Sequence, residues 1–343
     1  MDEHQHSLLD LEYKLLHELS AIHSNINQLC PINSLFPAEI LQIIFTFCMA
    51  HADAHGTPSK PHLSFTQVCR HWRILALEMP ALWSTIDICD PLLASLYLSR
   101  SGDTLISLFT KRSPTEFNGT LALNEVKNRI RKIDVLLFPN SLVRLFCNIA
   151  GFPFEFPSPR MVDAPGSLWL GNLTDLTLCV PAICDPVDLS SLYVGSVRRL
   201  VLSGVRVDWG TTSSELKVLD LSRLPDHFAP TVEELFGIFD RAKQSIEEVN
   251  FEDFFSPGPD ALPWTEKIET TCLRKLSISS RDKEFIQQIV LVLTTGPNTE
   301  VEVQHRGDRM TVDEGRLVYC SGRDLQRHYT EESVSLLGYR YPF

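Results

Sequence analysis

The amino-acid sequence predicts an α + α/β protein, in which an N-terminal helix and a small helical module precede an irregular solenoid of repeated strands. Two patterns predict this organisation. Apolar residues recur at helical spacings over residues 7–77. A short apolar strand motif then recurs between residues 130 and 278. The chain has 343 residues, 44% hydrophobic and 22% charged, which is long enough for two domains with ordinary cores.

Residues 1–32 are predicted to contain one helix over 7–30, which Pro31 ends. Its apolar seam, spaced by four and three residues in its second half, consists of Leu8, Leu15, Leu19, Ile22, Ile26 and Leu29. Glu12 interrupts the seam and Leu11 stands beside it. The seam covers about three heptads, near the minimum for a coiled coil. Two interpretations stay open: a homodimer or partner helix bound through residues 7–30, or a helix folded back on its own domain.

Residues 33–90 are predicted to form two short helices. Asn33 or Ser34 suits an N-cap, and Pro37 suits a first helical turn. The first helix carries a stripe of Ile40, Ile44 and Cys48, with Leu41 and Phe45 one position round. The second is predicted from Phe65 to Leu77, with Ser64 as N-cap and Pro80 beyond its end, and its inner face is predicted to carry Val68, Trp72 and Leu75 or Ala76. So small a module carries more apolar surface than it can hide, which predicts a docked partner or neighbouring domain.

This segment resembles an F-box domain, the helical module that docks a substrate receptor onto a ubiquitin ligase. The resemblance rests on Pro37-Ala38-Glu39-Ile40-Leu41-Gln42-Ile43-Ile44-Phe45, on Val68-Cys69-Arg70-His71-Trp72-Arg73, and on Pro80-Ala81-Leu82-Trp83. It implies a Skp-type adaptor as partner and, through the adaptor, a cullin. The implied adaptor-binding residues are Leu35, Phe36, Pro37, Glu39, Ile40, Leu41, Ile44, Val68, Cys69 and Trp72. The chain departs from the family pattern at Phe36, where Leu is usual, and in the insert over 49–62.

Residues 91–115 are predicted to form a connector. Its stretch Leu92–Asp103 has the pattern of a short helix with a glycine stop at Gly102, and Leu105–Phe109 alternates like a strand. The stretch Leu98-Ser99-Arg100-Ser101-Gly102 resembles the one that follows the F-box in many proteins of mushroom-forming fungi. In that type of protein, leucine-rich repeats follow.

Residues 116–320 are predicted to form an irregular leucine-rich-repeat solenoid with a terminal cap. The motif Leu-x-x-Leu-x-Leu, with apolar substitutes, begins at Leu173, Val197, Leu216, Ile246 and Leu273, with a weaker copy at Ile130. The intervals between these starting residues suit repeats of about 20–29 residues that stack their strands into a parallel sheet. Amphipathic helices are predicted around 232–239 and 285–293, and cap strands around 301–303, 310–312 and 317–319. The alternative is an ordinary α/β domain with Leu-rich strands, and residues 321–343 are predicted to be a tail.

Recognition of a protein target is predicted on the strand residues that lie between the leucines: Thr177, Val201, Asp220, Asn250 and Ser277. The stretch 226–269 is also acidic, with the pairs Glu233-Glu234, Glu247-Glu248 and Glu252-Asp253. Two interpretations of these pairs stay open. They form a solvated convex face, or they attract a basic target segment electrostatically.

Composition excludes several classes of function. The net charge of −12 and the lack of a basic stripe argue against nucleic-acid binding. The polar start predicts no signal peptide, and no apolar run suits a membrane helix. The nine cysteines are scattered without a Cys-x-x-Cys pair, which predicts reduced thiols rather than a zinc site or a disulfide framework. We therefore expect a cytoplasmic or nuclear protein.

No pattern for catalysis is present, so we expect no catalytic, cofactor-binding or metal-binding residues and a non-enzymatic role. An F-box-like module followed by a repeat solenoid implies a substrate receptor of a cullin-RING ubiquitin ligase. The rival expectation is a non-degradative, adaptor-bound or self-assembling repeat scaffold. A hydrolase with an unrecognised site is a remote third.

Overall fold

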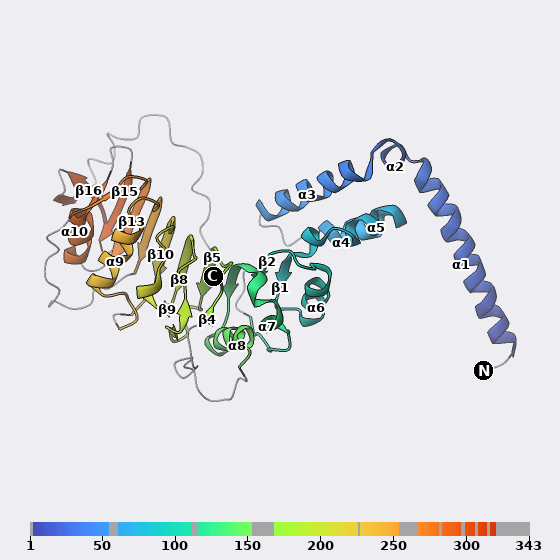
Figure 1. The fold of residues 1–343 in the computed structure, drawn as a ribbon, viewed down its shortest axis with the longest axis horizontal. Helices are drawn as coiled ribbons and strands as arrows, with labels where there is room; N and C mark the ends of the chain where they lie inside the picture. The colour runs from blue at the N-terminus through green and yellow to red at the C-terminus, as the bar shows by residue number, and fades with distance from the viewer. Residues whose placement is uncertain are drawn as a thin grey trace. The chain divides into compact units, whose positions relative to one another are not determined.

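The computed structural model describes residues 3–54, 61–110, 115–152, 168–225, 227–253, 267–280, 283–295, 299–305, 308–313 and 316–319. The chain divides into two compact units. Unit 1 comprises residues 1–111, 120–122 and 129–131, and unit 2 comprises residues 112–119, 123–128 and 132–343. Unit 1 is largely helical, whereas unit 2 is built on a large, mostly parallel sheet (Figure 1). The fold class is therefore mixed α/β.

Unit 1 begins with the long helix α1 (Glu3–Leu29), which confirms the predicted N-terminal helix. Pro31 opens the short helix α2 (Pro31–Leu35) instead of merely ending α1. Proline is tolerated there because the first residues of a helix have no intrahelical partner for their N–H groups. Helix α3 (Ala38–Ala54) follows and carries the first predicted helix of the module.

The second predicted helix of the module, over 65–77, differs from the prediction. It is divided into α4 (Pro61–Val68) and α5 (Arg70–Leu77), and the predicted N-cap Ser64 lies inside α4. Cys69 separates them with an extended backbone, φ −158° and ψ 172°, and serves as the N-cap of α5. Arg73 bridges the break, since its Nε donates to the carbonyl oxygen of Thr66 at 2.7 Å.

The interior of this module is aromatic. Leu41 and Phe45 on α3 are fully buried. The Phe45 ring stacks on Phe65 with centroids 4.3 Å apart and meets Trp72 at 5.1 Å. Trp72 Nε1 donates a 2.7 Å hydrogen bond to Asn33 Oδ1, which ties α5 to α2. The buried side of α3 is thus the Leu41–Phe45 side, one position round from the stripe that the sequence emphasised.

The predicted connector is an ordered part of unit 1. A 3₁₀ turn η1 (Pro80–Trp83) leads into β1 (Thr85–Asp87), α6 (Pro91–Arg100) and β2 (Ile106–Phe109), and the two strands pair in parallel. Trp83 is fully buried, packs edge-on against Tyr97 at 5.3 Å and is covered by the Arg100 guanidinium at 4.4 Å. Burial raises the pKa of Tyr97 to about 12. Trp83 and Tyr97 of this segment therefore belong to the core of unit 1.

Unit 2 carries the remaining elements. Its helices and turns are α7 (Leu123–Val126), η2 (Lys127–Arg129), α8 (Pro139–Ala150), η4 (Trp209–Thr211), α9 (Val232–Ala242) and α10 (Lys283–Val292). The strands of its main sheet are β3 (Ile130–Leu136), β5 (Asp175–Cys179), β8 (Arg199–Ser203), β10 (Val218–Ser222), β11 (Glu248–Glu252), β13 (Lys275–Ser280), β15 (Glu300–His305), β16 (Asp308–Asp313) and β17 (Arg316–Tyr319). Three two-stranded parallel sheets pair β4 (Leu168–Trp169) with β7 (Leu192–Tyr193), β6 (Val187–Leu189) with β9 (Val205–Val207), and β12 (Ile268–Thr270) with β14 (Leu293–Thr295).

The parallel strands of the main sheet are aligned motif on motif. Each strand from β3 to β15 pairs with the next repeat in the chain, with no register slip. One apolar row contains Ile133, Leu176, Leu200, Leu219, Val249, Leu276 and Val301. A second contains Val135, Leu178, Leu202, Leu221, Phe251, Ile278 and Val303. The predicted motifs thus share one register, as alternation at period two requires.

These apolar rows face the helices. The Phe251 ring lies 6.4 Å from Phe239 of α9 and 6.1 Å from Phe285 of α10, and all three side chains are buried. A capping box at Thr231 and Glu234 begins α9. The two helices predicted from amphipathic spacing therefore form and cover this side of the sheet, whereas α8 was not predicted.

At its last strands the main sheet changes from parallel to antiparallel pairing. Strands β15, β16 and β17 pair antiparallel in succession, so the three predicted cap strands are confirmed as strands. The predicted tail over 321–343 and residues 55–60 of the insert lie outside the described residues, whereas the insert's residues 49–54 belong to α3 and its residues 61–62 begin α4. Among the described helices, none combines the length and apolar character that a membrane span requires.

Candidate interaction surfaces

The first candidate surface is an apolar stripe that begins at Phe36, the C-cap residue of α2, and continues along the outside of α3. Phe36, Ile40, Ile43 and Phe47, spaced by four, three and four residues, keep 40–72% of their surface exposed. We call these four residues the outer stripe. Val68 at the end of α4 is also exposed, at 54%, so the prediction that it lies on the inner face of the second helix is wrong. A helix that is apolar on two sides, with only one side buried, has a surface suited to a protein partner.

The implied adaptor-binding residues divide between surface and interior. Leu35, Phe36, Pro37, Glu39, Ile40 and Val68 are exposed, and Ile44 and Trp72 are half-buried. Leu41 and Cys69 depart from the expectation of a surface cluster, because they are 0% and 8% exposed and face the module's own core. They support the surface from behind. Ile43 and Phe47 were missed, although their spacing from Ile40 places them on the same side of the helix.

The second candidate surface is the side of the main sheet of unit 2 that faces away from the helices. We call it the strand face. Its middle row consists of Asp134, Thr177, Val201, Asp220, Asn250, Ser277 and Glu302. All five residues predicted to bind a target therefore lie side by side in one row, and all five are half-buried. Their role in target binding stays a prediction.

The rows flanking the middle row differ in chemistry. On one side lie Lys132, Asp175, Arg199, Val218, Glu248, Lys275 and Glu300, in which positive and negative charges mostly alternate. On the other side lie Leu136, Cys179, Ser203, Ser222, Glu252, Ser279 and Gln304. The strand face is therefore mostly polar, with hydroxyl, amide and carboxylate groups in neighbouring rows and a few apolar positions such as Val201 and Val218. Such groups suit hydrogen-bonded recognition of a polar partner.

Asp220 occupies the centre of this face in an unusual environment. Burial raises the pKa of its carboxyl group, while a hydrogen bond from Asn250 and the charge of Arg199 act in the opposite direction. A partly desolvated carboxylate interacts more strongly with a hydrogen-bond donor than a solvated one does. Asp220 and Asn250 therefore form a hydrogen-bonded polar pair in the middle row of this face.

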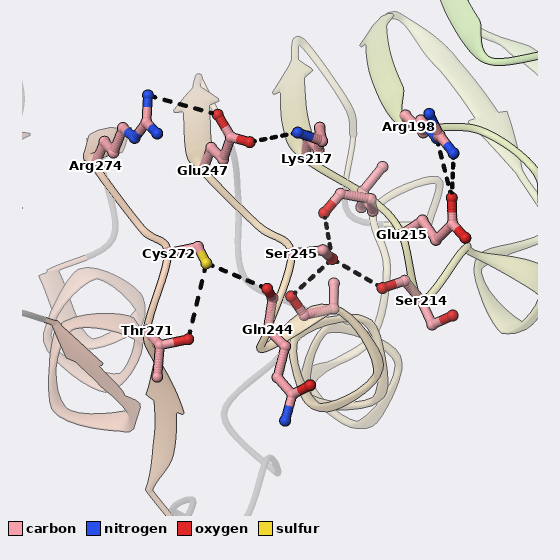
Figure 2. Close-up of polar contacts among 12 residues, drawn as sticks. Arg198, Ser214, Glu215, Lys217, Gln244, Ser245, Glu247, Thr271, Cys272 and Arg274 are labelled. Carbon is pink, nitrogen blue, oxygen red and sulfur yellow. Dashed lines mark hydrogen bonds and ion pairs between the residues drawn. The ribbon is translucent and has the colours of Figure 1, made fainter.

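The acidic pairs do not form one surface. Glu233 and Glu234 lie in the first turn of α9, on the helix side of the sheet. Glu247 lies before β11, where its oxygens meet Lys217 Nζ at 2.7 Å and Arg274 at 3.9 Å (Figure 2). The hydrogen bond from Lys217 lowers the pKa of Glu247. Glu248 and Glu252 point to the strand face, so only part of the acidic stretch can act on a molecule bound there.

A polar ladder joins successive repeats where the strands begin. Ser245 donates to the carbonyl oxygens of Ser214 and Leu216, at 2.8 and 2.9 Å, and Cys272 Sγ lies 3.2 Å from the carbonyl oxygen of Gln244 (Figure 2). Asn172, Ser196 and Thr299 reach carbonyl groups of the preceding repeat in the same way. This ladder serves the stacking of repeats and not the binding of a ligand.

The thiols and acids of the described residues do not assemble a chemical centre. No group of three His, Cys, Asp or Glu side chains in this part of the chain is arranged to hold a metal ion. Burial raises the pKa of Cys179 to about 11, and it raises that of Cys147 as well. These two thiols therefore stay protonated at neutral pH, which is the inert state of cysteine.

Comparisons of the chain with protein-family models, with curated proteins and with solved structures find no match.

Proposed function

We propose that this protein is a substrate-receptor subunit of a cullin-RING ubiquitin ligase of the Skp-cullin-F-box type, acting in the cytoplasm or nucleus. Unit 1 supplies the adaptor-binding module and unit 2 is a leucine-rich-repeat solenoid that holds the target. The observation that carries the proposal is the exposed outer stripe. It lies on α3 within the segment whose residues resemble an F-box.

The energetics favour a docked partner. Burying a large apolar side chain contributes about 1.5–3 kcal/mol, so the outer stripe and Val68 together offer ample driving force for association. The stripe is also backed by the rigid packing of Phe45, Phe65 and Trp72, which reduces the ordering cost of binding. A Skp-type adaptor is the partner implied by the sequence resemblance.

The adaptor proposal is tested by introducing charge into the stripe. Ile43→Asp combined with Phe47→Asp, and separately Ile40→Asp, should abolish co-purification of the adaptor, because an unpaired charge in a dry interface costs several kcal/mol. The matched control is Ser95→Asp, which adds the same charge to an exposed position of α6 in the same unit. Adaptor recovery that is unchanged by the stripe variants would contradict the assignment.

The cullin separates the two functional alternatives. A ligase receptor should bring the cullin along with the adaptor, and both should be lost together in the stripe variants. Recovery of the adaptor without a cullin would favour the non-degradative scaffold.

The strand face is the proposed target site. Seven aligned strands would give it a regular polar surface, and the ligase would act by raising the effective concentration of the target near the ubiquitin-charged enzyme. No catalytic group of this chain takes part. The acidic residues on this face, Glu248 and Glu252, contribute to encounter with a basic target.

Affinity purification with mass spectrometry tests the target site. Val201→Arg with Ser277→Arg should remove target proteins from the wild-type set while keeping the adaptor, because both side chains lie in the middle row. Glu233→Arg on the helix side is the control and should leave the set unchanged. Equal loss of targets in both variants would contradict recognition through the strand face.

A further inference from the structure

Helix α1 leaves a continuous apolar face uncovered. Its large aliphatic side chains are 47–81% exposed, and they are Leu8, Leu9, Leu11, Leu15, Leu16, Leu19, Ile22, Ile26 and Leu29. The helix has 27 residues, which corresponds to a length of roughly 40 Å. An isolated helix is only marginally stable in water, so a face of this length requires a partner for its apolar side chains.

The spacing of the side chains specifies the kind of partner. Leu8, Leu15, Ile22 and Leu29 follow one another at intervals of seven residues, and a second series at the same interval contains Glu12, Leu19 and Ile26. A seven-residue repeat keeps facing its partner only when two helices supercoil around each other. The occupant of this face is therefore a second helix with a matching heptad seam.

We propose that the occupant is α1 of a second copy of this chain, paired in parallel. The copy supplies a seam of the same length and period, whereas the next longest described helix, α3, has only 17 residues and has buried one of its faces. The proposal is independent of the adaptor and target sites, because it uses neither α3 nor unit 2.

The flanking residues favour the parallel orientation. When the two seams are in register, Leu11 lies beside the partner copy's Leu16, and the two form an apolar pair. Glu18 lies beside the partner copy's His23, and these two form a polar pair. An antiparallel pair centred on the same seam would bring Glu18 against its own counterpart. Like charges in direct contact are unfavourable, so the parallel pair is preferred.

Glu12 gives the proposal its sharpest test. In the parallel pair it faces the partner copy's Glu12 inside the seam, where a carboxylate weakens association. Glu12→Leu should therefore strengthen self-association, shifting the midpoint of dissociation to a roughly tenfold lower concentration or further, as about 1.4 kcal/mol would. A gain that stops at the mass of two chains distinguishes specific pairing from aggregation of a misfolded variant, which would give larger masses.

The experiment is sedimentation equilibrium, or light scattering with mass detection, on the full chain over a dilution series. The wild type should show the mass of two chains at high concentration, and Leu19→Lys with Ile22→Lys that of a single chain. The control, His17→Lys with Ser24→Lys, adds the same charges to the opposite side of α1 and should behave like the wild type. A charge exchange tests orientation: Glu18→Lys should weaken the pair, and adding His23→Glu should restore it.

Three outcomes would overturn the proposal: a wild type that remains a single chain at every concentration, a Glu12→Leu variant that associates no better than the wild type, or a control that dissociates as far as the seam variant. Failure of the charge exchange to restore association would overturn the parallel orientation. Because adaptor binding is measured separately, loss of self-association with the adaptor still bound would leave the proposed function standing.

Discussion

The module of unit 1 and the sheet of unit 2 treat their apolar residues in opposite ways. Along most of the parallel strands, the apolar side chains of the two buried rows alternate with mainly polar ones, Val201 of β8 being an exception, and the apolar rows are covered by helices of the same unit. Helix α3 instead has an apolar interior side at Leu41 and Phe45 and an apolar exterior side at the outer stripe. The apolar rows of the sheet are thus covered within unit 2, whereas the apolar side chains of the outer stripe stay exposed.

The largest expected effect comes from comparing two phenylalanines that lie on the buried and the exposed side of α3. Phe45 is 0% exposed and Phe47 is 72% exposed. Phe45→Ala should cost about 3–5 kcal/mol of unfolding free energy, because it opens a cavity beneath Phe65 and Trp72. Phe47→Ala should change stability by less than about 0.5 kcal/mol and yet weaken adaptor binding. Chemical denaturation of both variants, followed by adaptor titration, checks this. Equal destabilisation would show that α3 has no free side.

A smaller effect is expected where repeats are joined in unit 2. Ser245→Ala removes the hydroxyl that donates to the carbonyl oxygens of the preceding repeat and should lower stability by about 1 kcal/mol. Ser214→Ala is the control, since it alters a neighbouring exposed serine while keeping the backbone oxygen that accepts. Thermal unfolding measures both variants. A Ser245→Ala protein as stable as the control would mean that the ladder contributes nothing to stacking.

The smallest effects concern two carboxylates of unit 2 whose pKa values move in opposite directions. Burial raises the pKa of Asp220, so its ionisation opposes folding as pH rises above its ordinary value of 3.8. The pKa of Glu247 is lowered by Lys217, so its charge favours folding above its ordinary value of 4.5, and this contribution is lost as pH falls.

At neutral pH, Asp220→Asn should therefore raise the melting temperature slightly, while Glu247→Gln should lower it slightly. Both differences should shrink as the solution is acidified and the wild-type carboxylates become protonated. Melting curves across a pH series decide the matter. Shifts of the same sign in the two variants would rule out opposed electrostatic environments.

The sequence predicted those features that depend on local periodicity. The heptads of α1 and the alternating Leu motifs repeat a pattern that only one backbone period can satisfy, so the helix, the strands and even the middle row of the strand face were found. The two helices from amphipathic spacing, around Leu235 and Ile289, follow the same logic.

Features that depend on the choice between equivalent patterns could not be predicted. Helix α3 is apolar on two sides, and periodicity cannot decide that Leu41 faces inward while Ile43 faces outward. The extended Cys69 interrupts an unbroken helical pattern because tertiary packing outweighs local propensity. The ladder was missed because different residue types, Asn172, Ser196, Ser245 and Cys272, make equivalent contacts with the preceding repeat. The acidic pairs do not form one surface because side chains adjacent in sequence, such as those of Glu247 and Glu248, point in different directions.

Because the parallel strands share one register, the strand face presents its residues at a regular spacing along the sheet. From β3 to β15 the face advances by six strand spacings of about 4.8 Å each, or roughly 29 Å in all. An extended peptide of about nine residues has the same reach. Because no repeat shifts register, gaining or losing one repeat would change the length of the face by one strand spacing. The rows of the other strands would stay aligned. The extent of the strand face is thus set by the number of repeats, separately from the side chains that each repeat places on it.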